Sequence, residues 1–300
     1  MPASLNITRA AFLVASLCTL PHLTHLGAQE KTRHAAQKAP GNYAKVNGVN
    51  LYYEVHGTGK PLVLLHGGLF AGSLFGPVIA DLAKDRQVIV PDLQGHGHTA
   101  DVDRPIRHDH MADDIAGLIR HLGLQKADVG GYSMGGGVAL QVAIRHPQLV
   151  DRLIVASIPF KRDGFYAEML PQQAQVGAAM ADGMKGSPMY ELYQATAPRP
   201  QDFPKLLDKM GAMMRQHYDY SADITKITAK TLLVFADADM IPVTHIAGFY
   251  ALFGGGLRDA GWDGATRPKA QLSIIPNQTH YTLGAAPAFA SVAAAFLNEK

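Results

Sequence analysis

Residues 127–146 read ADVGGYSMGGGVALQVAIRH, and this stretch decides the fold. It begins as a short apolar strand, and an apolar helical run follows from Val138 to His146. Between them, Gly131-Tyr132-Ser133-Met134-Gly135 fits the pattern G-x-S-x-G, which is typical of a tight strand-to-helix turn. Glycines two positions before and after the serine suit a strained turn, because side chains there would collide. Such a turn would raise the Ser133 hydroxyl above a sheet and point a helix N-terminus, which favours negative charge, at the same place.

Four further motifs stand on either side of this stretch. They are Leu65-His66-Gly67-Gly68, Asp92-Leu93-Gln94-Gly95-His96-Gly97, Asp237-Ala238-Asp239 and Thr279-His280-Tyr281. With these motifs in this order, the chain resembles an α/β-hydrolase over nearly everything beyond about residue 43. The resemblance implies an α/β-hydrolase fold, with a mostly parallel twisted sheet flanked by helices and an inserted helical cap. It is specific for the fold and not for a substrate.

The composition limits the class of protein. Of the 300 residues, 47% are hydrophobic and 17% are charged, which is enough apolar material for a sizeable core. The net charge of +2 gives no indication of a nucleic acid as partner, so we expect a small-molecule substrate. The single cysteine, Cys18, lies in the leader, so the mature chain is expected to contain no disulfide and no cysteine nucleophile. The sequence leaves the oligomeric state open.

Residues 1–28 are predicted to form a secretory signal peptide. An apolar run from Ala10 to Leu20 follows Arg9, and the small residue Ala28 offers a cleavage point. The run is too short for a stable transmembrane anchor, and an uncleaved N-terminal anchor is the alternative. We therefore expect a protein of the bacterial periplasm or exterior, without stable membrane insertion. Residues 29–42 are polar and alanine-rich, and they are interpreted as a linker.

Strands alternate with helices in residues 43–158 and again in residues 230–300, the two parts of the predicted core. Asn47-Gly48 predicts a two-residue hairpin turn at the start of the first part. The alternation that follows predicts a parallel sheet with right-handed crossovers. The predicted buried strands cover residues 61–65, 88–90, 153–156, 231–235 and 271–275, and the predicted helices cover residues 73–84, 110–122, 138–146 and 286–298.

The alternation breaks in residues 159–229, which are predicted to form the helical cap. Methionine adapts to irregular ligands, so a cap rich in methionine favours a small or medium apolar substrate. Alternatively, these side chains pack one cap helix on another. The methionines concerned are Met169, Met180, Met184, Met189, Met210, Met213 and Met214. A second unusual segment, from Gly256 to Pro268, contains the only tryptophan, Trp262, and is interpreted as a surface flap or as part of the pocket entrance.

The motifs predict a catalytic triad. A serine hydroxyl is a weak nucleophile unless a base takes its proton, and that base is a histidine that a carboxylate holds in one tautomer. The resemblance implies the chain order serine, acid, histidine, with Ser133 as the nucleophile and His280 as the base. It implies Asp239 as the acid, because Asp239 precedes Pro242 by a few residues. Asp237 is the alternative acid and is otherwise expected to hold a turn.

An oxyanion hole needs two N–H donors beside the nucleophile. One is expected from Met134, the residue after the serine. The resemblance assigns the other to Gly68, with Leu69 as the second choice. His66 is then expected to brace this loop rather than to transfer protons.

Several histidine-containing segments raise the alternative of a metal site. Asp92 with His96 and His98 is one, and His108-Asp109-His110 is another. The first matches a structural turn of the resembling family, and the second lies where a helix begins and is able to cap it. No helical His-x-x-x-His pair and no phosphate-binding Gly-Lys-Ser/Thr sequence is present. We therefore expect neither a metal nor a cofactor.

Together these features predict a serine hydrolase that cleaves a small or medium apolar carboxylic ester through an acyl-enzyme. A lactonase, a hydrolase of a C–C bond beside a ketone, or a cofactor-free perhydrolase would use the same triad. The serine at position 133 argues against the related haloalkane dehalogenases and epoxide hydrolases, which use an aspartate there. A non-catalytic binding protein on the same fold is the alternative from another class, and the presence of all three triad residues disfavours it.

Overall fold

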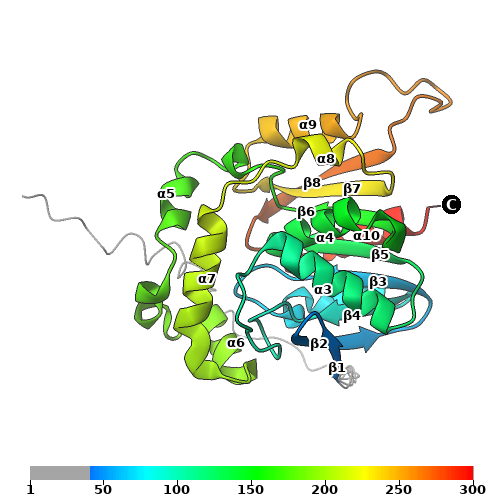
Figure 1. Cartoon of the computed structure of the whole chain (residues 1–300). Helices are drawn as coiled ribbons and strands as arrows, with labels where there is room; N and C mark the ends of the chain where they lie inside the picture. The colour runs from blue at the N-terminus through cyan, green and yellow to red at the C-terminus, as the bar shows by residue number, and fades with distance from the viewer. Residues whose placement is uncertain (1–40, 300) are drawn as a thin grey trace, which may run out of the picture.

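The computed structural model describes residues 41–299 (Figure 1). The predicted signal peptide and nearly all of the predicted linker lie outside the described residues. The first strand, β1, begins at Asn42. Within residues 41–299, no helix is long and apolar enough to cross a membrane.

One eight-stranded sheet forms the centre of the molecule, with the strand order β1-β2-β4-β3-β5-β6-β7-β8. The pairs β1–β2 and β2–β4 are antiparallel, and all other neighbours are parallel. The strands are β1 (Asn42–Val46), β2 (Val49–His56), β3 (Lys60–Leu65), β4 (Arg86–Pro91), β5 (Ala127–Tyr132), β6 (Val150–Ala156), β7 (Lys230–Ala238) and β8 (Ala270–Thr279). This is the mostly parallel sheet that the sequence predicts.

The predicted hairpin is present at the start of the sheet. Asn47 and Gly48 have φ values of 46° and 81°, and Val46 pairs with Val49 across the turn. Two consecutive residues with positive φ fit a type I′ turn, whose twist matches that of the flanking strands.

Helices cover both faces of the sheet and bury a separate apolar cluster on each. Figure 1 shows α3 (His108–His121) and α4 (Met134–Arg145) in front of the sheet and α10 (Pro287–Leu297) behind it. The front cluster also takes in side chains of α9 (Val243–Leu252). The rear cluster is formed with α2 (Pro77–Leu82) and α10. Because both faces are covered, the central strands are apolar runs rather than alternating ones.

The single helix predicted for residues 73–84 is wrong. The segment is a 3₁₀ turn, η1 (Gly72–Phe75), followed by the short helix α2. Gly76 separates them with a φ of 38°, and Pro77 follows it. A left-handed glycine and a proline without an N–H group interrupt the helical hydrogen bonds at this point.

Residues 159–229 contribute no strand to the sheet and consist mainly of short helices. The helices are α5 (Met169–Ala174), α6 (Pro188–Thr196), α7 (Phe203–Arg215) and α8 (Ser221–Ile224), with 3₁₀ turns η3 (Arg162–Gly164), η4 (Ala178–Met180), η5 (Asp182–Met184) and η6 (Pro200–Asp202). Figure 1 shows α5, α6 and α7 together beside one end of the strands. The α7 side chain Lys209 fixes this segment to the core by donating to both carboxylate oxygens of Asp101, at 2.9 and 2.7 Å.

The segment between α9 and β8 projects away from the body of the molecule (Figure 1). Trp262 at its centre is fully exposed, and Leu257 is 68% exposed. Trp262 therefore does not shape a pocket entrance in this structure, and the surface-flap interpretation fits.

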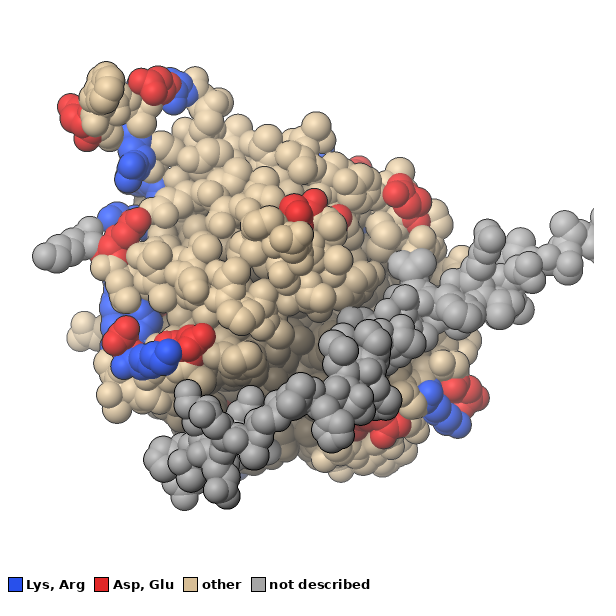
Figure 2. Space-filling view, turned by 180° about the vertical axis from the view of Figure 1, so that it is seen from behind, with Lys and Arg blue, Asp and Glu red and all other residues tan. Residues whose placement is uncertain are grey.

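On the rear face, acidic and basic side chains lie next to one another near the margin (Figure 2).

Candidate active site

Ser133 stands on a strained turn between β5 and α4. Its φ of 54° and ψ of −122° lie outside the regions that side-chain-bearing residues favour. The flanking glycines explain how the turn closes. A Cβ on Gly131 would lie 2.0 Å from the carbonyl oxygen of Gly135, and a Cβ on Gly135 would lie 2.2 Å from that of Leu65. The G-x-S-x-G spacing is thus a steric requirement of this turn.

The three predicted triad residues lie in hydrogen-bonding contact. Ser133 Oγ is 3.0 Å from His280 Nε2, and His280 Nδ1 is 3.0 Å from Asp239 Oδ1. Ser133 follows β5, Asp239 follows β7 and His280 follows β8. The carboxyl ends of parallel strands meet at one edge of a sheet, and this brings residues separated by up to 147 positions together.

The Asp239 carboxylate is buried and accepts four hydrogen bonds. Oδ1 accepts from Met240 N at 2.8 Å as well as from His280. Oδ2 accepts from Ser157 Oγ at 2.5 Å and from Ala236 N at 3.2 Å. Burial by itself raises the pKa of Asp239, but these bonds and the attraction of His280 outweigh it, so the pKa lies below its ordinary value. Asp239 is therefore held as a carboxylate.

Asp237, the alternative acid, is exposed, and its hydrogen bonds go to the backbone rather than to His280. Its two oxygens accept from the backbone N–H groups of Asn277 and Gln278, at 3.0 and 3.1 Å. These bonds lower the pKa of Asp237. Asp237 thus holds the end of β8 that leads to His280.

The candidate oxyanion residues lie beside Ser133. A Cβ on Gly67 would be 3.4 Å from Ser133 Cβ, and one on Gly68 would be 3.8 Å from Met134 Sδ. Leu69, the second choice, has a positive φ of 63°. The loop after β3 therefore runs directly over the start of α4.

His66 braces this loop, as predicted. It is fully buried, its Nδ1 lies 2.8 Å from the carbonyl oxygen of Gly67, and its Nε2 accepts from Leu93 N at 3.0 Å. This pattern fits the neutral ring with the proton on Nδ1. Burial also lowers the pKa of His66.

Tyr132 is a site contact that sequence reasoning missed. Its hydroxyl donates to the backbone carbonyl of His280, and its ring lies 5.4 Å from the imidazole, centroid to centroid. The same ring packs against Gly67 and Gly284, where an added Cβ would approach to 3.0 and 3.1 Å. An aromatic residue beside the nucleophile was the only signal available in the sequence.

The cap helix α7 reaches the candidate oxyanion loop through Met210. A Cβ on Gly68 would lie 2.6 Å from Met210 Cε, and Met210 is 1% exposed. Met184 and Met189 are also buried, whereas Met169, Met180, Met213 and Met214 are partly buried. Of the predicted methionines, Met210 is the one that a contact places at the site.

The candidate metal residues have other partners. Asp92 accepts from Gly72 N at 2.8 Å, from His98 N at 2.9 Å and lies 2.9 Å from His98 Nδ1, so it holds the turn after β4. His108 is the first residue of α3, and its Nδ1 lies 3.2 Å from the Tyr220 hydroxyl rather than capping the helix. Within residues 41–299, no group of three or more His, Cys, Asp or Glu side chains is arranged to hold a metal ion.

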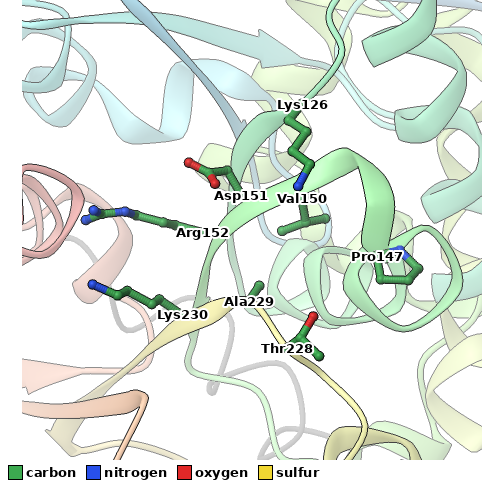
Figure 3. Close-up of a pocket in the computed structure, with 8 residues that line it drawn as sticks. All are labelled: Lys126, Pro147, Val150, Asp151, Arg152, Thr228, Ala229 and Lys230. Atoms are coloured by element: carbon green, nitrogen blue, oxygen red, sulfur yellow. The ribbon is translucent and has the colours of Figure 1, made fainter. Parts of the chain in front are cut away.

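A surface hollow is lined by residues that include Lys126, Asp151 and Lys230 (Figure 3). Its lining comes from the amino-terminal ends of the strands, because Lys126 precedes β5, Asp151 and Arg152 lie near the start of β6, and Lys230 begins β7. Ser133 follows the carboxyl end of β5. The hollow is therefore separate from the candidate triad.

Comparison with known proteins supports the α/β-hydrolase fold. A family model described as alpha/beta hydrolase fold matches residues 60–239. The 2-hydroxymuconate semialdehyde hydrolase of Pseudomonas sp. (strain CF600) is 35% identical over 128 residues, which cover 41% of this chain and 45% of that protein. The match thus spans less than half the length of this curated relative.

Solved structures share the fold over most of the chain. E-2-(acetamidomethylene)succinate hydrolase superimposes with a TM-score of 0.67 at 19% identity, covering 87% of this chain and 99% of that one. The enol-lactonase from Burkholderia xenovorans LB400 superimposes with a TM-score of 0.64 at 21% identity, covering 86% and 100%. At such identities the likeness concerns the fold alone. Because the family model matches more than half of the sequence, this chain belongs to the alpha/beta hydrolase fold family.

Proposed function

We propose that the protein is a serine hydrolase that cleaves a small or medium apolar carboxylic ester through an acyl-enzyme. The observation that carries the proposal is the continuous chain Ser133 Oγ–His280 Nε2 and His280 Nδ1–Asp239 Oδ1, with 3.0 Å at each step. It begins at a serine whose backbone is held in a strained conformation, the kind of strain that clusters at functional sites.

Each residue has a defined role in the proposed reaction. His280 Nε2 takes the proton of Ser133 as its oxygen attacks the ester carbonyl, and Asp239 keeps the imidazole proton on Nδ1. The N–H groups of Met134 and Gly68 stabilise the oxyanion that forms. His280 then protonates the departing alcohol, and a water molecule hydrolyses the acyl-enzyme by the same steps.

The preference for an apolar substrate rests on the cap. Met210 covers Gly68 from α7, so the candidate oxyanion hole has an apolar side chain above it. An apolar roof excludes water and strengthens hydrogen bonds to the oxyanion, because charge interactions grow as the local dielectric falls. It also suits a flexible apolar acyl or alcohol group.

A second candidate is hydrolysis of a C–C bond beside a ketone by the same triad. The similarity to 2-hydroxymuconate semialdehyde hydrolase favours it. The two candidates differ in the bond that breaks and share the nucleophile, so inspection of Ser133 does not separate them.

A fluorophosphonate probe tests the shared part of both candidates. We expect wild type to be labelled at Ser133 and the Ser133→Ala variant to remain unlabelled, because labelling requires an activated serine. A panel of p-nitrophenyl esters, lactones and vinylogous diketones then identifies the bond. Folded wild type that neither labels nor turns over any member would instead support a non-catalytic binding protein.

A further inference from the structure

Ser157 lies between the candidate nucleophile and the candidate acid. It directly follows β6, it is fully buried, and its N–H donates to Val234 O on the neighbouring β7 at 2.9 Å. The carbonyl of the preceding Ala156 accepts from Ser133 N at 2.8 Å. Through this short segment, the backbone of the elbow and the strand that carries Asp239 are joined.

The Ser157 hydroxyl donates to Asp239 Oδ2 at 2.5 Å, on the oxygen that does not face His280. The other donor to this oxygen is Ala236 N at the longer distance of 3.2 Å. Without the hydroxyl, Oδ2 would keep one long hydrogen bond, and the carboxylate would be freer to rotate away from His280 Nδ1. A hydrogen bond to an ionised group is among the strong ones.

The backbone of Ser157 is strained, with a φ of 49°. Glycine adopts this conformation without penalty, whereas serine does not. Within residues 41–299, the non-glycine residues with positive φ are Asn47, Leu69, Ser133, Ser157 and Asn277. Apart from the hairpin residue Asn47, these residues are Leu69 in the loop of the candidate oxyanion residues, Ser133 at the elbow, Ser157, and Asn277 near the end of β8 before His280. The strained backbone positions, Asn47 apart, therefore cluster around the candidate active site.

We infer that Ser157 is a positioning residue for Asp239: its hydroxyl fixes the carboxylate so that Oδ1 meets His280 Nδ1. The inference rests on the proposed triad and extends it by one member. Ser157 acts through Asp239 and does not reach the substrate. A serine in a conformation that favours glycine has a reason to be there only if its side chain is needed, and its one side-chain hydrogen bond goes to Asp239.

Two variants separate this role from a merely structural turn. Ser157→Ala removes the hydroxyl and keeps the strain, and Ser157→Gly removes the hydroxyl and relieves the strain. We expect both to lower kcat by roughly 10- to 100-fold, the effect of one hydrogen bond to a charged group, with KM little changed. Ser157→Gly should melt about 2–4 °C above Ser157→Ala. Ser291→Ala, at an exposed serine of α10, is the matched control and should change nothing.

The pH profile and a double-mutant cycle show whether Ser157 acts through Asp239. The Ser157 hydrogen bond helps to lower the pKa of Asp239, so its loss should raise that pKa and move the acidic limb of kcat/KM to higher pH. In an Asp239→Asn background, Ser157→Ala should lower kcat by less than about threefold, because the carboxylate that Ser157 positions is already absent.

Three outcomes overturn the inference. They are a Ser157→Gly variant with wild-type kcat, an acidic limb of kcat/KM that does not move, and a Ser157→Ala loss of kcat that is as large in the Asp239→Asn background as in wild type. Failure of the proposed function is recognised separately, because wild type itself would then fail to react with the fluorophosphonate at Ser133. That result would overturn both ideas, whereas normal wild-type labelling with unaffected Ser157 variants would overturn only this one.

Discussion

Replacement of Asp239 by asparagine removes the charge at the end of the hydrogen-bonded chain and keeps the side-chain shape. If the amide nitrogen takes the Oδ1 position, it faces His280 Nδ1 and the Met240 N–H, both within 3.0 Å of that oxygen now. The imidazole must then carry its proton on Nε2, where it has to accept the proton of Ser133.

The other orientation is also harmful. With the amide nitrogen at the Oδ2 position, it faces Ser157 Oγ and the N–H of Ala236. The tautomer of His280 is then preserved, but the imidazolium that forms during the reaction has lost its buried counter-charge. The same replacement in the serine-protease template lowers turnover by roughly ten-thousand-fold, or about 5 kcal/mol of transition-state stabilisation, and we expect a loss of that order.

Asp237→Asn is the matched control, two positions earlier in the chain. Its carboxylate is exposed and accepts from the backbone N–H groups of Asn277 and Gln278 at the end of β8, so an asparagine oxygen can keep one of these bonds. We expect a loss of less than about tenfold. Initial rates with a p-nitrophenyl ester measure the losses of both variants, and circular dichroism verifies that each variant is folded. An Asp237→Asn loss larger than that of Asp239→Asn would refute the assignment.

Three further predictions concern the cap, the pH response and the leader. Met210→Ala should raise KM or reorder the preference in an ester chain-length series by about 1–3 kcal/mol per lost contact, without abolishing fluorophosphonate labelling. The control Met184→Ala should only lower the melting temperature. An unchanged substrate preference for Met210→Ala would make Met210 a packing residue. Burial lowers the pKa of His108 from its usual 6.5 to about 4. Between these pH values the unfolded chain binds a proton at His108 and the folded protein does not, so the free energy of unfolding should fall as the pH decreases from 6.5 to about 4. Melting temperatures across this range should fall less steeply for His108→Asn, and an equal slope would contradict the reasoning. We propose that the protein is exported, so N-terminal sequencing of periplasmic or secreted material should give a start near Gln29, and an intact Met1 would exclude cleavage.

Local physical rules explain how much of this protein can be predicted from its sequence. The elbow is readable because Gly131 and Gly135 are required by contacts within a few ångströms of Ser133, and such steric demands leave a fixed spacing. The buried parallel strands are readable because both faces are covered, which makes them continuous apolar runs. The hairpin is readable because Asn47-Gly48 suits two successive positive φ values.

Other features depend on how distant segments meet. The sequence places Asp237 and Asp239 two residues apart, and only the resemblance to the family favours Asp239. Asp237 lies within an irregularity of the β7–β8 pairing, between Ala236 and Ala238, and its exposed carboxylate accepts from the backbone of residues 277–278. Asp239, just beyond this irregularity, is buried and bonds to His280. The roles of Ser157 and Met210 also depend on distant segments. The partner of Ser157 is 82 positions away, and the contact of Met210 with Gly68 requires the cap to be folded onto the core.

The sequence by itself therefore determined the α/β architecture, the elbow and the candidate residue types, because backbone sterics and apolar periodicity act over short distances along the chain. The tertiary structure decided which carboxylate reaches His280, which hydroxyl holds that carboxylate and which methionine covers the oxyanion loop. Those choices follow from the meeting of β6, β7, β8 and α7 at one edge of the sheet, and no local pattern encodes the distance between two strands that are far apart in the chain.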